Sequence, residues 1–179
     1  MRIARVLLLG VCTSVLTAAA ARAQDHGNVG ITIGFPAAVG VLWHVSDAVA
    51  IRPDFRISGT SSDPGDVDGW TFGTGVSALF YMRDADNVRT YFSPRIDYQR
   101  NTSNVTALGI QQTRTSHAWG TAGSFGAEYN PNRRFGVFGE IGFSYSRLKV
   151  DAVSSFITEG TSHGWGTRAG VGVIYYPGS

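Results

Sequence analysis

Apolar and polar side chains alternate with a period of two between residues 70 and 100. Even positions from 70 to 82 are mostly apolar, whereas most odd positions are Gly, Ser or Thr. After a polar turn at 84–87 the alternation resumes, with Phe92 and Ile96 on one face and Arg95 and Asp97 on the other. A period of two places successive side chains on opposite faces, so both segments predict long β-strands.

The charged positions lie in the middle of these strands, between apolar partners, and the scheme repeats to the end of the chain. This arrangement favours a barrel with apolar residues facing lipid and polar residues facing the lumen. We therefore predict an all-β fold, a closed eight-stranded antiparallel up-and-down transmembrane β-barrel. The expected strands are 28–35, 37–45, 49–58, 70–82, 88–100, 115–129, 135–149 and 162–176. Short connections alternate with longer ones at 59–69, 101–114 and 150–161, as periplasmic turns alternate with outer loops.

The N-terminus predicts a cleaved signal peptide over residues 1–23. Arg2 and Arg5 precede an apolar stretch that ends in Ala21-Arg22-Ala23, a typical cleavage site, so residues 24–179 form the expected barrel domain. This leader holds three arginines and no acidic residue, so the net charge of +2 becomes −1 when it is removed. The remaining charge gives no reason to expect a nucleic-acid partner.

Composition removes several other classes of function. The single cysteine, Cys12, lies in the leader, which excludes disulfides and thiolate chemistry from the exported chain. No apolar run after residue 24 is long enough for a transmembrane helix. The four histidines show no metal-ligand spacing and no His–Ser–acid set converges, so we expect no metal, no cofactor and no enzymatic activity.

Aromatic residues on the apolar phase cluster near strand ends, where amphipathic rings settle at the two interfaces of a bilayer. We expect one aromatic girdle toward the outer surface and a second toward the periplasm. The first holds Trp70, Trp119 and Trp165, and the second holds Trp43, Phe80, Phe92, Tyr129 and Tyr175.

The opposite phase collects charged residues of both signs. An eight-stranded barrel is only wide enough to be filled by its own side chains, so these charges must pair inside it. We predict a lumen network that closes the barrel, formed by Arg52, Asp54, Arg56, Arg89, Arg95, Asp97, Glu128, Glu140 and Arg168. A proton or ion path along the same residues is the alternative.

Four basic residues fall at the outer ends of strands. Guanidinium groups at this level would attract lipopolysaccharide phosphates. The possible lipopolysaccharide contacts are Arg100, Arg114, Arg147 and Lys149, and an ordinary solvated rim is the competing interpretation.

Taken together, these features resemble the small OmpA/OmpX-type outer-membrane β-barrel superfamily. They are the leader, the eight alternating segments, the alternation of short and long connections, the aromatic girdles and the charged lumen. The resemblance implies a monomer in the outer membrane of a Gram-negative-type cell, in contact with lipid and lipopolysaccharide. It also implies handling by the barrel-assembly machinery, which reads a terminal aromatic in this group. Here Tyr175 and Tyr176 precede Pro177-Gly178-Ser179.

The function expected from these observations is a structural or envelope-interaction role, with a lumen plugged by charged side chains. Three alternatives remain at this stage. They are a narrow channel for small solutes, a soluble periplasmic barrel of lipocalin type with an apolar cavity, and a lipid A-modifying enzyme. Bilayer conductance, detergent-free solubility and lipid A mass would distinguish them.

Overall fold

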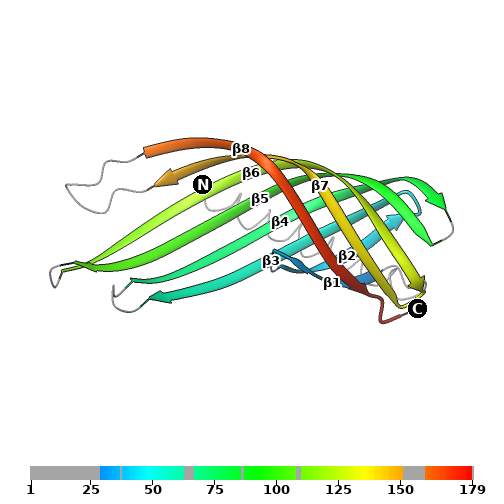
Figure 1. Ribbon diagram of the computed structural model, residues 1–179, viewed down its shortest axis with the longest axis horizontal. Coiled ribbons are helices and arrows are strands. Elements are labelled where there is room, and N and C mark those ends of the chain that lie inside the picture. The colour runs from blue at the N-terminus through cyan, green and yellow to red at the C-terminus, as the bar shows by residue number, and fades with distance from the viewer. Residues whose placement is uncertain are drawn as a thin grey trace, which may run out of the picture.

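A computed structural model describes residues 29–36, 38–62, 67–85, 87–107, 110–150 and 160–178. The predicted signal peptide lies outside the described residues. Eight antiparallel strands follow one another around a closed barrel, so the predicted fold class is confirmed (Figure 1). They are β1 (Val29–Phe35), β2 (Ala38–Ser46), β3 (Val49–Ser62), β4 (Val67–Ala85), β5 (Val88–Ala107), β6 (Ile110–Asn132), β7 (Phe135–Val150) and β8 (Gly160–Tyr175). Within the described residues no helix is long and apolar enough to cross a membrane.

The two ends of the barrel differ in their connections. We call the end with the connections at 36–37, 63–66, 108–109 and 151–159 the loop end, and the end with the connections at 47–48, 86–87 and 133–134 the turn end. The last described residues also lie at the turn end (Figure 1). In an up-and-down topology every second connection returns to the same side, so the two sets of connections lie at opposite ends of the barrel.

Two hairpins extend farther toward the loop end than the sequence predicted. Residues 59–62 and 67–69 are paired strand rather than loop, and β5 and β6 remain paired as far as Ala107 and Ile110. The expectation of long loops at 59–69 and 101–114 is therefore wrong. Residues 59–62, 68–69 and 101–104 are all Gly, Ser, Thr, Asn or Asp, so the alternation that marks a half-buried strand is lost there although the backbone ladder continues.

The first hairpin is short by comparison. β1 has 7 residues and β2 has 9, whereas β5 has 20 and β6 has 23. A strand that crosses a bilayer needs about 9–11 residues. Pairing of β1 with β8 ends at Phe35 and Val171, and pairing of β2 with β3 ends at Val39 and Phe55. The barrel wall is therefore low on one side.

Side chains segregate as the alternation predicts. Ile96, Phe143 and Val171 are more than half exposed on the outside, while Arg52, Ser93 and Glu140 are buried inside. An apolar outside and a polar inside is the reverse of a lipocalin-type barrel.

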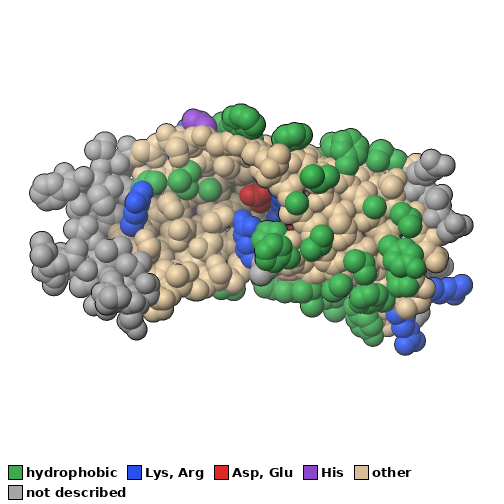
Figure 2. Space-filling model, in the orientation of Figure 1, with side chains coloured by type: hydrophobic (Ala, Val, Ile, Leu, Met, Phe, Trp, Pro, Cys, Tyr) green, Lys and Arg blue, Asp and Glu red, His purple; other side chains and the backbone are tan. Residues whose placement is uncertain are grey.

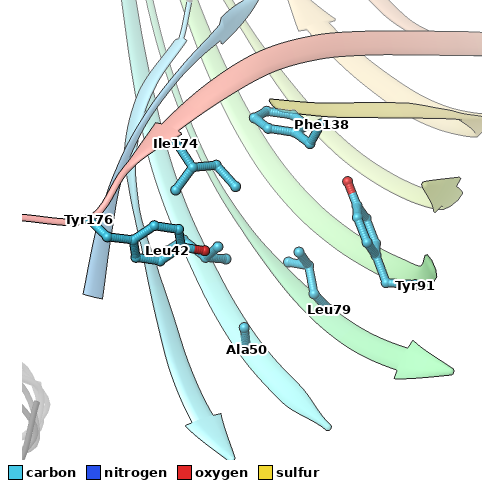
Figure 3. Packing of buried hydrophobic residues seen from close by; sticks show 7 residues of the cluster. All are labelled: Leu42, Ala50, Leu79, Tyr91, Phe138, Ile174 and Tyr176. Carbon is cyan, nitrogen blue, oxygen red and sulfur yellow. The ribbon is translucent and has the colours of Figure 1, made fainter. Parts of the chain in front are cut away.

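The lumen nevertheless contains an apolar cluster that the sequence interpretation had not assigned there. It lies within the turn half of the barrel and consists of Leu42, Ala50, Leu79, Tyr91, Phe138, Ile174 and Tyr176 (Figure 3). These residues sit on the inward phase of their strands, so strand parity places them inside despite their apolar character. Hydrocarbon and aromatic rings, as well as charged groups, therefore occupy the lumen of the turn half.

Candidate functional site

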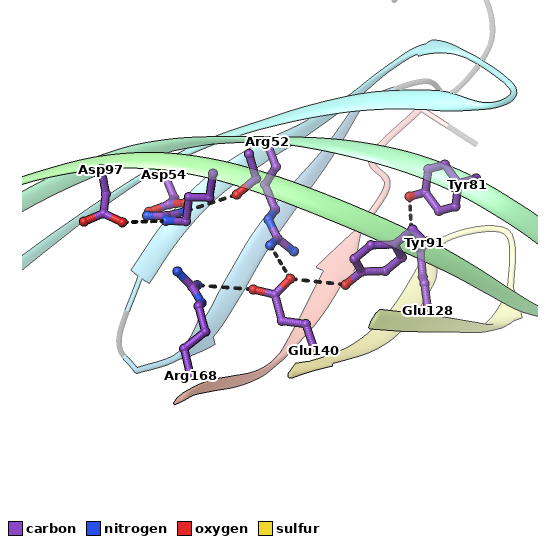
Figure 4. A network of polar contacts seen from close by, with 10 residues as sticks. Arg52, Asp54, Tyr81, Tyr91, Asp97, Glu128, Glu140 and Arg168 are labelled. Carbon is purple, nitrogen blue, oxygen red and sulfur yellow. Dashed lines mark hydrogen bonds and ion pairs between the residues drawn. The ribbon is translucent and has the colours of Figure 1, made fainter. Parts of the chain in front are cut away.

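Glu140 on β7 is the centre of the polar contacts in the middle of the lumen. Its Oε2 accepts a hydrogen bond from Arg52 at 2.7 Å and one from the Tyr91 hydroxyl at 3.4 Å. Its Oε1 lies 3.3 Å from the Nη2 of Arg168 (Figure 4). The Arg52 guanidinium also lies 4.7 Å from the ring centroid of Phe138. A carboxylate that is 8 % exposed needs such partners, because an unpaired buried charge is strongly unfavourable.

Arg95 on β5 forms the second ion-pair centre, nearer the loop end. Its Nη1 and Nη2 donate to the two carboxylate oxygens of Asp54 on β3, and its Nε lies 3.4 Å from Asp97. Gly75 and Gly120 provide the space for these groups. A Cβ at Gly75 would overlap the Arg95 guanidinium, and one at Gly120 would lie 2.6 Å from Asp97 Oδ2.

Arg56 differs from the other inward arginines. Its Nη2 donates to the amide oxygen of Gln99 at 2.7 Å, a neutral partner. Arg168 shares its carboxylate with Arg52, since both approach Glu140. Positive charge is therefore least compensated around Arg56 and Arg168, and both side chains are only half-buried.

Glu128 on β6 organises a separate group in the turn half. Its carboxylate accepts hydrogen bonds from Tyr81 at 2.8 Å, from Asn130 at 2.9 Å and from Tyr176 at 3.0 Å. The ring of His44 stacks on Tyr81 at 5.5 Å, and its Nε2 lies 3.3 Å from the Tyr176 hydroxyl. Glu128 is 1 % exposed, so these donors replace its hydration.

The nine charges predicted to form one network therefore lie in two groups. Arg52, Asp54, Arg95, Asp97, Glu140 and Arg168 form ion pairs in the middle of the lumen, with Arg56 bound to Gln99 beside them. Arg89 belongs with the Glu128 group, because its guanidinium lies 3.9 Å from the ring centroid of Tyr81 and donates to the carbonyl of Asp47. Tyr91 links the two groups through Glu140 and its ring contact with Tyr81.

Sequence reasoning missed the inward tyrosines. Tyr81, Tyr91 and Tyr176 are three of the six side chains that donate hydrogen bonds to Glu128 and Glu140. Tyr91 lies on the same odd phase as Arg89 and Arg95, so strand parity was the signal that could have placed it inside.

The aromatic residues assigned to the two girdles lie on the outward phase. Seven of the eight are exposed, Trp165 most at 85 %, and Trp43 is half-buried. Outward apolar side chains such as Val76, Ile96 and Ile141 lie on the same strands between them.

An outward motif occurs twice near the loop end. Tyr98-Gln99-Arg100 on β5 pairs with His117-Ala118-Trp119 on β6, and Tyr145-Ser146-Arg147 on β7 pairs with His163-Gly164-Trp165 on β8. In each copy the tyrosine hydroxyl bonds the histidine Nδ1, at 2.5 and 2.6 Å, with the two rings stacked. Each copy therefore presents one arginine and one tryptophan on the same outer surface.

The four basic residues predicted at the outer strand ends are all exposed. Arg100 lies 5.9 Å from the ring centroid of Trp70, and Arg147 is the register partner of Trp119. Arg114 pairs with Ser103, and Lys149 pairs with His117. The two outward arginines thus lie beside aromatic rings, which is typical of a membrane interface.

The described part of the chain holds no group of three His, Cys, Asp or Glu side chains that could bind a metal ion. The three described histidines, His44, His117 and His163, each contact a tyrosine hydroxyl. Their geometry suits ring stacking and hydrogen bonding within the wall and lumen.

This chain is similar to several known proteins. A major outer membrane protein from Thermus thermophilus superposes with a TM-score of 0.56 over 82 % of this chain and 97 % of its own, at 11 % identity. Neisserial surface protein A matches with a TM-score of 0.45 over 83 % and 92 % of the two chains, at 14 % identity. No curated protein matches this chain in sequence.

The outer membrane protein beta-barrel domain family matches residues 7–179, almost the whole chain. This protein, a barrel of the outer membrane, therefore belongs to that family.

Proposed function

We propose that this barrel has a structural and envelope-interaction role, with a lumen that is closed to solutes in its turn half. The contacts around Glu128 and the apolar cluster beside it support closure. Side chains from β2, β3, β4, β5, β6, β7 and β8 fill the same level of the lumen. An eight-stranded barrel has an interior that side chains can fill, so this packing supports a lumen without a solute-sized path.

Single-barrel conductance in planar bilayers tests this proposal. The wild-type barrel is expected to show no steady conductance, whereas the combined change Tyr81→Ala, Tyr91→Ala and Tyr176→Ala removes three inward rings and should open a pore. The matched control is Tyr98→Ala, Tyr129→Ala and Tyr145→Ala, which removes three outward rings and should leave the barrel closed. Steady conductance of the wild-type barrel would instead establish the narrow channel.

We assign the loop end to the cell surface and the two outward motifs to contact with lipopolysaccharide. A guanidinium beside an aromatic ring at the interface suits phosphate binding. Water is partly excluded there, and the guanidinium can form charge-assisted hydrogen bonds with phosphate oxygens. The observation that favours this over a solvated rim is the repetition of the same four residue types on two neighbouring hairpins.

Binding of purified lipopolysaccharide to the barrel in neutral micelles tests the assignment. Arg100→Gln with Arg147→Gln should weaken binding several-fold and reduce its salt dependence, since two cations are lost. Arg133→Gln with Arg134→Gln removes the same charge at the turn end and serves as the control. Equal losses in the two double variants would show a general charge effect and contradict the assignment.

We propose no catalytic role. The described histidines bond tyrosine hydroxyls on the wall or in the lumen, an arrangement that does not activate a serine nucleophile. An unchanged lipid A mass in cells that express the protein is the expected result, and an altered mass would establish the enzyme alternative.

A further inference from the structure

The low wall at the first hairpin leaves two strands with an uncovered edge. Beyond Phe55, β3 continues to Ser62, and before Val171, β8 begins at Gly160, yet the described residues of β1 and β2 pair with neither extension. Residues 57–61 of β3 and 160–165 of β8 are exposed on both faces. A paired wall would bury the inward phase of these segments, so the wall that the described residues form is open sideways here.

This opening lies within the apolar height of the barrel. The tip of the first hairpin stands well below the level of Trp165, because Phe35 pairs with Val171, six residues closer to the turn end along β8. Trp165 and Ile57, on the two strands that border the opening, are both strongly exposed on the lipid-facing side. The gap therefore faces the hydrocarbon of the leaflet at the loop end rather than water alone.

A cavity of about 460 Å³ lies behind the gap. Its lip is apolar and includes Phe35, Pro36, Ala38 and Val171, while its inner wall carries charged side chains from β3, β5, β7 and β8. Figure 2 shows the hollow, with basic and acidic side chains at its inner end beside the apolar tip of the hairpin. The cavity is thus polar inside and apolar where it meets the membrane.

The charges of the cavity do not balance. Among the described residues that line it there are four arginines (Arg52, Arg56, Arg95 and Arg168) and three carboxylates (Asp54, Asp97 and Glu140). Arg56 donates to neutral Gln99, and Arg168 shares Glu140 with Arg52. An anionic group placed between Arg56 and Arg168 would restore neutrality and gain charge-assisted hydrogen bonds.

We propose that this cavity binds the anionic head group of a single-chain amphiphile, whose hydrocarbon chain leaves through the gap above the first hairpin into the membrane. The cationic interior recognises the head group, and the apolar lip accepts the start of the chain. The closed turn half forms the floor, so the bound molecule does not pass through the barrel.

Binding of radiolabelled laurate to the barrel in phosphatidylcholine nanodiscs tests the proposal, with empty nanodiscs subtracted. Saturable binding of laurate is expected, and methyl laurate, which lacks the charge, should show none. Arg56→Gln with Arg168→Gln should lower the affinity about tenfold or more, because two bonds to a charged group are lost. Gly166→Trp should also abolish binding, since nothing lies within 4 Å of a Cβ at this position and the indole can fill the upper lumen.

Arg100→Gln with Arg147→Gln is the matched control, because it removes two arginines from the outside near the same end. Its laurate affinity should equal that of the wild type, and each variant must show the heat-sensitive gel mobility of a folded barrel. Equal loss in the outside variant, or equal binding of methyl laurate, would overturn the proposal. Displacement of laurate by inorganic phosphate at concentrations similar to that of laurate would show a free-anion site and overturn entry from the membrane.

Discussion

The turn half and the loop half of the lumen are built on the same strands but are filled in different ways. In the turn half, Glu128 and three donors lie among buried hydrocarbon, and Tyr91, Leu42 and Leu79 are almost completely shielded. In the loop half, arginines and carboxylates line an open cavity, and Ser146 on the inward phase is exposed. The difference shows that strand parity fixes which way a side chain points, while the height of the neighbouring wall decides whether it is buried.

The largest expected effect comes from removing the carboxylate at the centre of the turn half. Glu128→Ala leaves Tyr81, Tyr176 and Asn130 without their acceptor and should reduce the free energy of unfolding by about 3–5 kcal/mol. Asp97 lies in the more exposed loop half, so Asp97→Ala should reduce the free energy of unfolding by less than about 1 kcal/mol. Urea unfolding in micelles measures both, and similar losses would show that the two halves are equally packed.

Two inward glycines offer a smaller test of the same comparison. A Cβ at Gly126 would overlap the ring of Tyr91, whereas nothing lies within 4 Å of one at Gly166. Gly126→Leu should therefore destabilise the barrel by about 1–3 kcal/mol through overpacking. Gly166→Leu should be close to neutral by the same unfolding measurement. A large loss at Gly166 would mean that the loop half is filled.

The smallest effect concerns single hydroxyl groups. Tyr176→Phe removes a buried hydrogen bond to Glu128 and should reduce the free energy of unfolding by about 1–1.5 kcal/mol. Tyr145→Phe removes an exposed bond to His163, and we expect a loss below about 0.5 kcal/mol because water replaces the partner. The reverse order of these two losses would contradict the assignment of the turn half as the stable core.

The sequence predicted the strand number and the orientation of most side chains, because period-two alternation is strongest where one face is apolar and the other polar. Ile96 and Arg95 illustrate this, one outside and one inside. The same signal fails at residues 101–104, which are all polar although their strand is fully paired. Strand length beyond the membrane is therefore invisible to a hydrophobic pattern.

Contacts in the lumen were less predictable than orientation. The bond between Glu128 and Tyr176 joins residues 48 positions apart, and its existence depends on the register of three successive strands. Parity could indicate that both residues face inward but not that they meet. The apolar residues Leu42, Leu79 and Ile174 were not assigned to the lumen for a related reason. An apolar side chain on the polar phase departs from the alternation, and its contacts inside the barrel are known only when the neighbouring strands are placed.

The short first hairpin has a further consequence for the surrounding bilayer. With 7 and 9 residues, β1 and β2 provide less apolar height than the strands opposite them in the ring, β5 and β6. Lipid next to the first hairpin must thin or tilt to match it, while lipid next to β5 and β6 need not. The barrel therefore has no single hydrophobic thickness and imposes a wedge-shaped annulus, which would give it a preferred orientation toward neighbouring membrane proteins and toward thinner patches of membrane.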